Sequence, residues 1–149
     1  MNEDKKWMEI AIQEAIIAEK EGEVPVGAIL VRDNILIAKA HNQPIANNDA
    51  TAHAEIQLIR EAGSRLGNYR LTNTSLYVTL EPCAMCFGAM IHARVSRIVY
   101  GASDSKTGVC GSRKDFSNLD CFKHRATVNG GVLKKECSQM LSNFFKIRR

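Results

Sequence analysis

The sequence predicts an α/β protein, a three-layer α/β/α sandwich in which helices cover both faces of a mixed sheet of about five strands. Three observations favour this class. Strand-like runs alternate with helical periodicities after an initial hairpin, the helical segments carry apolar stripes, and 45% of the 149 residues are apolar, enough for one core. No repeat or Pro- or Ser-rich linker divides the chain, so we expect one domain over residues 1–149.

The first elements are predicted to be a helix and a β-hairpin. A helix from about residue 5 to residue 20, ending near Gly22, is indicated by apolar residues at helical spacing: Trp7, Ala11, Ala15 and Ala18. Residues 26–31 and 35–40 are β-rich runs joined by the short polar turn 32–34. Two antiparallel strands are therefore expected.

The middle of the chain predicts a helix and a buried strand. Thr51 is the expected N-cap of a helix that runs from Ala52 to about Arg65. Its apolar stripe recurs with a period near three and a half, at Ile56, Ile59 and Ala62. Residues 76–80 then form a short apolar run typical of a buried strand.

The last third continues the alternation. Pro82 suits the opening of a helix from Cys83 to about Arg94, and residues 97–102 indicate another strand. Residues 103–125 are polar, with room for a short helix. Residues 127–133 are expected to form the last strand, and residues 134–146 are expected to form a closing amphipathic helix. The long crossover favours a parallel final strand.

Charge and cysteine content narrow the function classes. Residues 1–93 hold 8 Lys and Arg against 12 Asp and Glu, net −4, whereas residues 94–149 hold 12 against 4, net +8. The basic C-terminal part suits a polyanion such as nucleic acid, although a solvated basic face is the alternative. The chain lacks a long apolar run and begins with charged residues, so we expect a cytoplasmic protein without a membrane span. Five cysteines argue against a disulfide framework.

Two short motifs predict a metal site. His53-Ala54-Glu55 is followed about thirty residues later by Pro82-Cys83-Ala84-Met85-Cys86. One imidazole and two sulfurs leave a zinc ion an open position for water, whereas a structural zinc closes its tetrahedron with a fourth side chain. No remaining Cys or His shows the paired spacing of a second half-site, which favours catalysis over structure.

Helix placement explains how these residues could converge. We expect both motifs where a strand leads into a helix, with His53 and Glu55 in the first turn of one helix and the two cysteines in the first turn of another. Residues three apart share a helix face, so Cys83 and Cys86 can reach one ion, and helix N-termini favour thiolates. Glu55 is then available as a base, although a charge that complements the helix dipole is the alternative.

Three further residues carry no assigned role. His92 is six residues past Cys86 on the same helix and is interpreted as a packing or interface residue. Glu81 is either a hydrogen-bond partner near the metal or a loop charge, and both alternatives stay open. Phe87, which follows the second cysteine of the pair, could alter the packing of this helix across a dimer interface.

The motifs resemble those of the zinc-dependent nucleoside and nucleobase deaminases. The resemblance to the bacterial tRNA-specific adenosine deaminases extends over nearly the whole chain. It rests on the zinc motifs and on flanking segments that include Val24-Pro25-Val26-Gly27-Ala28, His41-Asn42-Gln43-Pro44, Tyr69-Arg70-Leu71, Gly88-Ala89-Met90-Ile91-His92 and Lys106-Thr107-Gly108. It implies a cytidine-deaminase-like fold and one Zn²⁺ per subunit.

The resemblance also implies a reaction and roles for individual residues. His53, Cys83 and Cys86 would hold the zinc, and the zinc-bound water would attack C6 of adenine with Glu55 as proton shuttle. Asn42 would bind the flipped base between walls formed by Val26, Ala54 and Leu80. The resemblance further implies contacts with neighbouring nucleotides of the anticodon loop. The residues at the matching positions are Asp104, Lys106, Phe145, Arg148 and Arg149.

The substrate that the resemblance implies is the wobble adenosine of an arginine-type tRNA anticodon, which is converted to inosine. The resemblance also implies a homodimer whose interface includes the helix after Cys83. An unpaired anticodon base is already out of its stack, which lowers the cost of reaching a pocket. One alternative is a zinc-dependent deaminase of a free base or nucleoside such as cytosine, guanine or cytidine. A second is a non-catalytic RNA-binding module with structural zinc.

Overall fold

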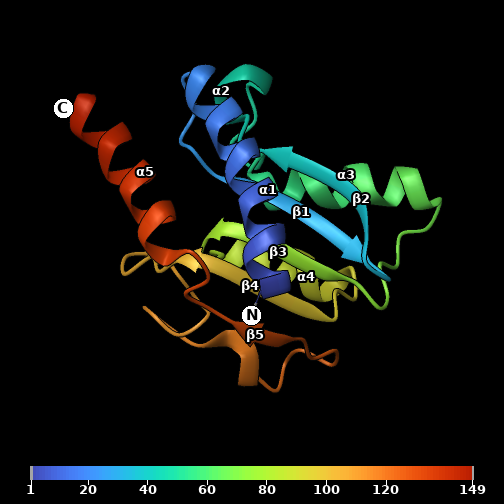
Figure 1. Cartoon of the computed structure of the whole chain (residues 1–149). Helices are drawn as coiled ribbons and strands as arrows, with labels where there is room; N and C mark the ends of the chain where they lie inside the picture. Colours follow the sequence, from blue (N-terminus) through green and yellow to red (C-terminus); the bar gives the residue numbers. More distant parts are fainter. Residues whose placement is uncertain (1, 149) are drawn as a thin grey trace.

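The fold is built on one five-stranded mixed sheet. In the computed structural model, which describes residues 2–148 (Figure 1), the strand order is β2-β1-β3-β4-β5. The strands are β1 (Gly27–Arg32), β2 (Ile35–His41), β3 (Ser75–Leu80), β4 (Arg97–Ala102) and β5 (Thr127–Asn129). β1 pairs antiparallel with β2 and β3, whereas β4 pairs parallel with β3 and β5. The predicted mixed sheet and parallel final strand are confirmed.

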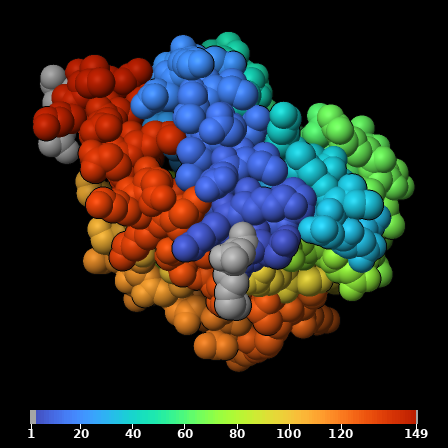
Figure 2. Space-filling view, in the orientation of Figure 1, coloured from blue at the N-terminus to red at the C-terminus, as the bar shows by residue number. Residues whose placement is uncertain are grey.

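Helices cover both faces of this sheet. α1 (Asn2–Lys20) and α5 (Lys134–Ile147) pack on one face, and α3 (Ala54–Leu66) and α4 (Ala84–His92) lie on the other. Figure 2 shows the surfaces of α1 and α5 side by side on the first face. The three-layer α/β/α architecture is confirmed; α2 (Pro44–Asn47) and the 3₁₀ turn η1 (Phe116–Asn118) are additional short elements.

The two cores follow from the alternation of side chains along the strands. In β1, Ala28 and Leu30 enter the core beneath α3 and α4, whereas Ile29 and Val31 enter the core beneath α1. Asp33 and Asn34 between β1 and β2 both have positive φ angles, of 53° and 60°. This backbone twist matches that of a tight hairpin, so the predicted turn forms where expected.

The start of α3 differs from the prediction. Thr51 is not the N-cap, because the helix begins at Ala54. The Thr51 hydroxyl instead donates to the Asp49 carboxylate at 2.7 Å. His53 is the residue at the N-cap and its side chain makes no capping hydrogen bond. The imidazole therefore remains available for other partners.

The last strand is shorter than predicted. β5 ends at Asn129 instead of Leu133, and Gly131 and Leu133 take positive φ angles of 87° and 53°. A Cβ at Gly130 would overlap the Tyr100 ring, so the chain passes too close to β4 for a bulkier residue. These backbone conformations turn the chain from the sheet into α5.

Phe87 packs inside the subunit. Its side chain is 1% exposed, and its ring centroid lies 6.2 Å from that of Phe116 and 5.6 Å from that of Phe122. The edge-on geometry with Phe116 is a favourable aromatic arrangement. His92, by contrast, is exposed at the end of α4.

An ion pair joins α1 to the sheet. Arg97 donates two hydrogen bonds to the Asp4 carboxylate, at 2.8 and 2.7 Å, and the Tyr77 hydroxyl donates a third at 2.8 Å. The bonds from Arg97 hold the pKa of Asp4 well below its usual range, and Asp4 is 7% exposed. The carboxylate therefore stabilises the folded state as long as it is charged.

We expect Asp4→Asn to lower the free energy of unfolding at pH 7 by about 2 kcal/mol, because a charge-assisted bidentate pair is lost. The folded-state pKa is depressed, so the contribution is fully present above the pKa of the unfolded carboxyl. It declines as pH falls below about 4, where the unfolded chain takes up the proton first. Urea unfolding of the wild type and of Asp4→Asn at pH 7 and pH 3.5 measures this contribution. A difference in unfolding free energy between the two proteins that is larger at pH 3.5 than at pH 7 would contradict the prediction.

No helix among residues 2–148 combines the length and apolar character needed to cross a bilayer.

Candidate metal centre and active site

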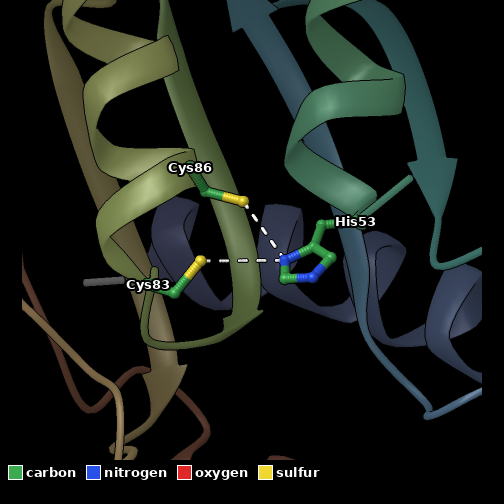
Figure 3. A group of neighbouring side chains, drawn as sticks. All are labelled: His53, Cys83 and Cys86. Atoms are coloured by element: carbon green, nitrogen blue, oxygen red, sulfur yellow. Dashed lines mark hydrogen bonds between the residues drawn. The ribbon is translucent and has the colours of Figure 1, made fainter. Parts of the chain in front are cut away.

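The predicted metal ligands lie together where two helices begin. Cys83 is the N-cap of α4 and Cys86 lies in its first turn, while His53 immediately precedes α3. The Nδ1 atom of His53 is 3.7 Å from the Cys83 sulfur and 3.4 Å from the Cys86 sulfur (Figure 3). All three ligand atoms lie within 4.8 Å of one another. Only the cysteines follow a strand directly, since α2 and a turn precede His53.

The electrostatics of this cluster favour a thiolate. A hydrogen bond with Cys86 lowers the pKa of the Cys83 thiol to about 4, and His53 contributes in the same direction. The hydrogen bond between the two sulfurs raises the pKa of the Cys86 thiol. The hydrogen bond between Cys83 and His53 raises the pKa of the His53 imidazole. A metal cation that binds here meets one preformed thiolate and displaces the proton of the second thiol.

The donor set fits zinc. One imidazole nitrogen and two sulfurs are ligands that zinc prefers. Among residues 2–148, no fourth His, Cys, Asp or Glu atom joins the three. A tetrahedral ion held by His53, Cys83 and Cys86 would therefore keep one position for a non-protein ligand, which is the arrangement of a catalytic zinc. The predicted zinc cofactor is confirmed by this geometry and by the family described below.

Glu55 lies in the pocket beside this cluster without being a member of it. It is the second residue of α3, two positions after His53, and it is 4% exposed. Burial raises the pKa of its carboxyl to about 7. A carboxyl group with a pKa near neutrality can both accept and return a proton, as a general acid–base catalyst must.

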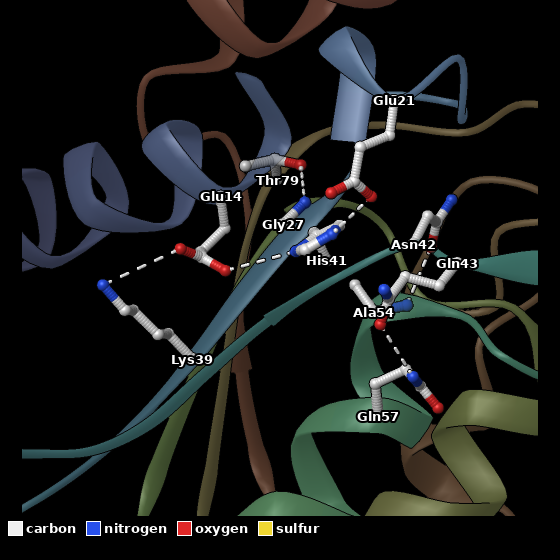
Figure 4. A network of polar contacts seen from close by, with 10 residues as sticks. All are labelled: Glu14, Glu21, Gly27, Lys39, His41, Asn42, Gln43, Ala54, Gln57 and Thr79. Carbon is white, nitrogen blue, oxygen red and sulfur yellow. Dashed lines mark hydrogen bonds and ion pairs between the residues drawn. The ribbon is translucent and has the colours of Figure 1, made fainter. Parts of the chain in front are cut away.

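Asn42 is held by a backbone hydrogen bond that sets the direction of its amide. Its Oδ1 atom accepts the N–H of Ala54 at 2.7 Å, the first free N–H of α3 (Figure 4). Within the described part of the chain, the Asn42 NH₂ group makes no hydrogen bond. Since Asn42 lines the pocket, this group is a donor available to a bound molecule.

A pocket of about 710 Å³ opens over the metal ligands and brings together residues from distant parts of the chain. Its lining includes these predicted site residues: Val26, Asn42, His53, Glu55, Leu80, Cys83, Asp104, Lys106 and Phe145. Ala54, predicted as a wall, is instead fully buried and contributes its backbone N–H to Asn42. A pocket of this size has room for a nucleobase and adjoining groups.

The predicted RNA-contacting residues occupy different places. Phe145 on α5 is 44% exposed at the pocket, and Lys106 is exposed beside it. The Asp104 carboxylate accepts the N–H groups of Lys106 and Thr107, at 3.0 and 3.1 Å, so it shapes its own loop. The Arg148 guanidinium stacks on the Phe144 ring at 3.6 Å and is not among the lining residues. The prediction for Arg149 lies outside the described residues.

Several lining residues were not predicted from the sequence. They are Val24, Pro44, Glu81, Ser103, Ser105, Thr107, Leu141 and Ser142. One available signal was helical spacing, because Leu141 is four residues before Phe145 and shares its face of α5. Ser142 is three residues before Phe145 on the same helix, and Pro44 is the first residue of α2. The remaining lining residues come from loops, whose course has no periodic signal.

Comparisons with known proteins agree with this site. The family model of the cytidine and deoxycytidylate deaminase zinc-binding region matches residues 1–102. The tRNA-specific adenosine deaminase of Haemophilus influenzae is 50% identical over 147 residues, covering 98% of this chain and 85% of that protein. The Bacillus subtilis protein of the same name is 47% identical over 146 residues, covering 98% and 91%.

Solved structures give the same result. A structure from work on A-to-I editing by tRNA:A34 deaminases at the wobble position of transfer RNA has a TM-score of 0.89 at 43% identity, covering 91% of this chain and 99% of that one. Guanine deaminase from Nitrosomonas europaea has a TM-score of 0.80 at 22% identity, covering 94% and 83%, and supports the fold alone. With its three-ligand zinc site and its similarity along almost the whole length, the chain is a zinc-dependent deaminase and belongs to the tRNA-specific adenosine deaminase family.

Proposed function

We propose that this protein hydrolyses adenosine to inosine at the wobble position of a tRNA anticodon, with an arginine-type tRNA as the substrate. The observation that carries the proposal is the placement of Glu55 beside a three-ligand metal site, inside a pocket large enough for a base. Relatives that cover 98% of the chain are named tRNA-specific adenosine deaminase. The reaction consumes water and releases ammonia.

The metal and Glu55 are assigned different parts of the reaction. When bound, the zinc ion supplies Lewis acidity that makes a water molecule a nucleophile near neutral pH. Glu55 accepts the proton of that water and delivers it to the adenine ring nitrogen next to C6. Glu55 then takes the second proton of the water from the new hydroxyl group on C6 and passes it to the amine, which leaves as ammonia while C6 keeps the oxygen as a carbonyl. One carboxyl group thus acts first as base and then as acid. Its burial excludes competing solvent.

The base site is assigned to the part of the pocket lined by Asn42, Val26 and Leu80. The Asn42 amide donates to an acceptor on the flipped base, and Val26 and Leu80 provide apolar contact with its faces. Lys106 and Phe145 at the pocket suit the phosphates and bases of neighbouring loop nucleotides, because an ammonium pairs with phosphate and an aromatic ring stacks on bases. Arg148, which follows the last residue of α5, adds an exposed guanidinium at this end of the helix.

The oligomer and the compartment are part of the same proposal. α4 presents Ala84, Met85 and His92 on its exposed surface, and Met85 is 38% exposed. An exposed apolar helix face suits a homodimer interface. Since the substrate is a tRNA, the homodimer is expected to act in the cytoplasm.

The decisive experiment supplies the purified zinc-containing protein with an anticodon stem-loop that carries adenosine at the wobble position. We expect inosine at that position and no deamination of free cytosine, guanine, adenosine or cytidine. A stem-loop with cytidine at the same position is the matched control. Turnover of a free base or nucleoside in the absence of stem-loop turnover would contradict the tRNA assignment in favour of the free-base alternative.

Asn42→Asp tests the base site. The new carboxylate still accepts the Ala54 N–H but cannot donate, so we expect kcat/KM for the stem-loop to fall about 10- to 100-fold, as for one lost hydrogen bond to a buried partner. Asn68→Asp is the control, because Asn68 Oδ1 likewise accepts a backbone N–H, that of Arg70 at 2.9 Å, on an exposed loop. Equal effects of the two substitutions would rule out the assigned donor role.

A further inference from the structure

Glu81 is a buried carboxylate to which the proposed reaction assigns no role. It follows the last residue of β3 and precedes Cys83 by two positions, and it is 2% exposed. It is not a member of the metal-ligand cluster. Burying a charged carboxylate is unfavourable unless its oxygens are well hydrogen-bonded, so its partners indicate what it does.

All four side-chain hydrogen bonds described for Glu81 come from one segment, residues 103–112, here called the pocket loop. The Oε1 atom accepts the N–H of Asp104 at 3.0 Å and the hydroxyl of Ser112. The Oε2 atom accepts the N–H groups of Cys110 and Ser112, at 2.8 and 3.1 Å. One carboxylate thus binds the loop near its beginning and at its end, through charge-assisted bonds.

The backbone around Glu81 holds the same loop. The Glu81 N–H donates to the Ala102 carbonyl at 2.8 Å, just before the loop begins, and the Pro82 carbonyl accepts the Val109 N–H at 3.0 Å. Gly108 lies so close that a Cβ there would overlap the Glu81 carboxyl group. The pocket loop is therefore fitted around this side chain.

The pocket loop also forms one wall of the pocket. Its residues 103–107 all line the cavity. Lys106 and Thr107 are exposed, and the turn that presents them depends on the Asp104 carboxylate within the same loop. The side chains of residues 103–107 are exposed or half-buried, whereas Val109 and Cys110 later in the loop pack in the core. The hydrogen bonds to Glu81 are therefore the side-chain contacts that tie the beginning of this wall to the β3–α4 segment that carries Cys83.

We propose that Glu81 is a positioning residue that fixes the pocket loop relative to the metal ligand Cys83, and so sets how tightly the RNA substrate is held. The identity of that substrate rests on the function proposed above. Glu81 touches neither the metal nor the base in this role, so its loss weakens substrate binding more than the chemical step. A carboxylate suits the role because two acceptor oxygens can satisfy four convergent donors.

Glu81→Gln tests the proposal. Glutamine has the size of glutamate, but its NH₂ group replaces one acceptor oxygen and cannot accept hydrogen bonds from the N–H groups that face it. In the zinc-loaded protein we expect KM for the wobble-adenosine stem-loop to rise about tenfold with kcat within about twofold. Hydrogen exchange at the amides of residues 104, 110 and 112 is expected to accelerate at least about tenfold. Trypsin is expected to cleave faster after the exposed residues Lys106, Arg113 and Lys114.

Two controls separate positioning from a general loss of stability. Ser112→Ala removes only the hydroxyl donor, so its effect on KM is expected to stay below about threefold. Glu9→Gln makes the same chemical change on the exposed face of α1 and is expected to change nothing. If Glu81→Gln fails to fold, Gly108→Ala replaces it, because its Cβ displaces the loop from Glu81 without changing any hydrogen-bonding group.

The outcomes that overturn the proposal are specific. Unchanged amide exchange and trypsin cleavage in a folded variant would show that Glu81 does not hold the loop. A fall in kcat at constant KM, or loss of zinc, would assign it to the chemistry or to the metal site instead. The exchange and cleavage measurements need no substrate, so they still test the loop if the wild-type protein fails to deaminate the stem-loop and the proposed function is wrong.

Discussion

Glu55→Gln is expected to lower kcat for deamination of the stem-loop by at least about a thousandfold while the protein keeps its fold and one zinc per subunit. The amide has the size of the carboxyl group but cannot take up and return a proton. General acid–base catalysis contributes 10²- to 10⁴-fold in enzymes, and here one group is assigned two proton transfers. Inosine formation under single-turnover conditions, together with the zinc content, measures this effect.

Glu61→Gln is the matched control for this substitution. Glu61 lies on α3 as well but is exposed, and its only described hydrogen bond comes from Arg65 at 3.1 Å. Its loss is expected to change kcat less than twofold. Loss of zinc or of folding in Glu55→Gln would indicate a structural carboxylate, and retained turnover would contradict the assigned proton transfers.

Much of the fold was predictable because its determinants are local. The positive φ angles of Asp33 and Asn34 occur in a two-residue turn flanked by β-branched runs, a pattern that specifies a hairpin. The metal cluster was predictable for a similar reason. Cys83 and Cys86 are placed together by one turn of one helix, so only the approach of His53 depends on the tertiary structure.

The errors occurred where distant residues decide the local conformation. The packing of Phe87 was not predictable either, because its partners Phe116 and Phe122 lie some thirty residues later in a loop without periodicity. The end of β5 depends on the Tyr100 ring, against which only a glycine fits at position 130. Thr51 shows the same effect on a shorter scale, because the Asp49 carboxylate accepts both its backbone N–H and its hydroxyl and holds it in a turn before the helix.

The pocket loop shows the same limit at the site. Residues 103–112 have no sequence periodicity, and their conformation depends on Glu81, which lies 23 to 31 positions earlier in the chain. Sequence reasoning left two alternatives open for Glu81, a partner near the metal or a loop charge. The contacts combine elements of both, since the carboxylate is buried next to a metal-ligand segment and organises a loop.

Gly27→Ala is expected to lower the free energy of unfolding by at least about 3 kcal/mol. A Cβ at position 27 would lie 2.5 Å from the Ala15 nitrogen and would also overlap the Ala11 carbonyl oxygen. Both are backbone atoms of α1, so no side-chain rotation relieves the overlap and the helix must move off the sheet. Urea unfolding at pH 7 measures the loss.

Gly63→Ala is the control, because position 63 lies inside α3 and a Cβ there meets only the Asn68 carbonyl oxygen at an ordinary 3.5 Å. Alanine favours a helix over glycine, so this variant is expected to be as stable as the wild type or up to about 1 kcal/mol more stable. The Gly27 N–H also donates to the Thr79 hydroxyl at 3.1 Å, and the preceding Val26 lines the pocket. A shift of β1 should therefore weaken substrate binding as well, and a Gly27→Ala protein with wild-type stability and KM would show that α1 is not held against β1 as the structure places it.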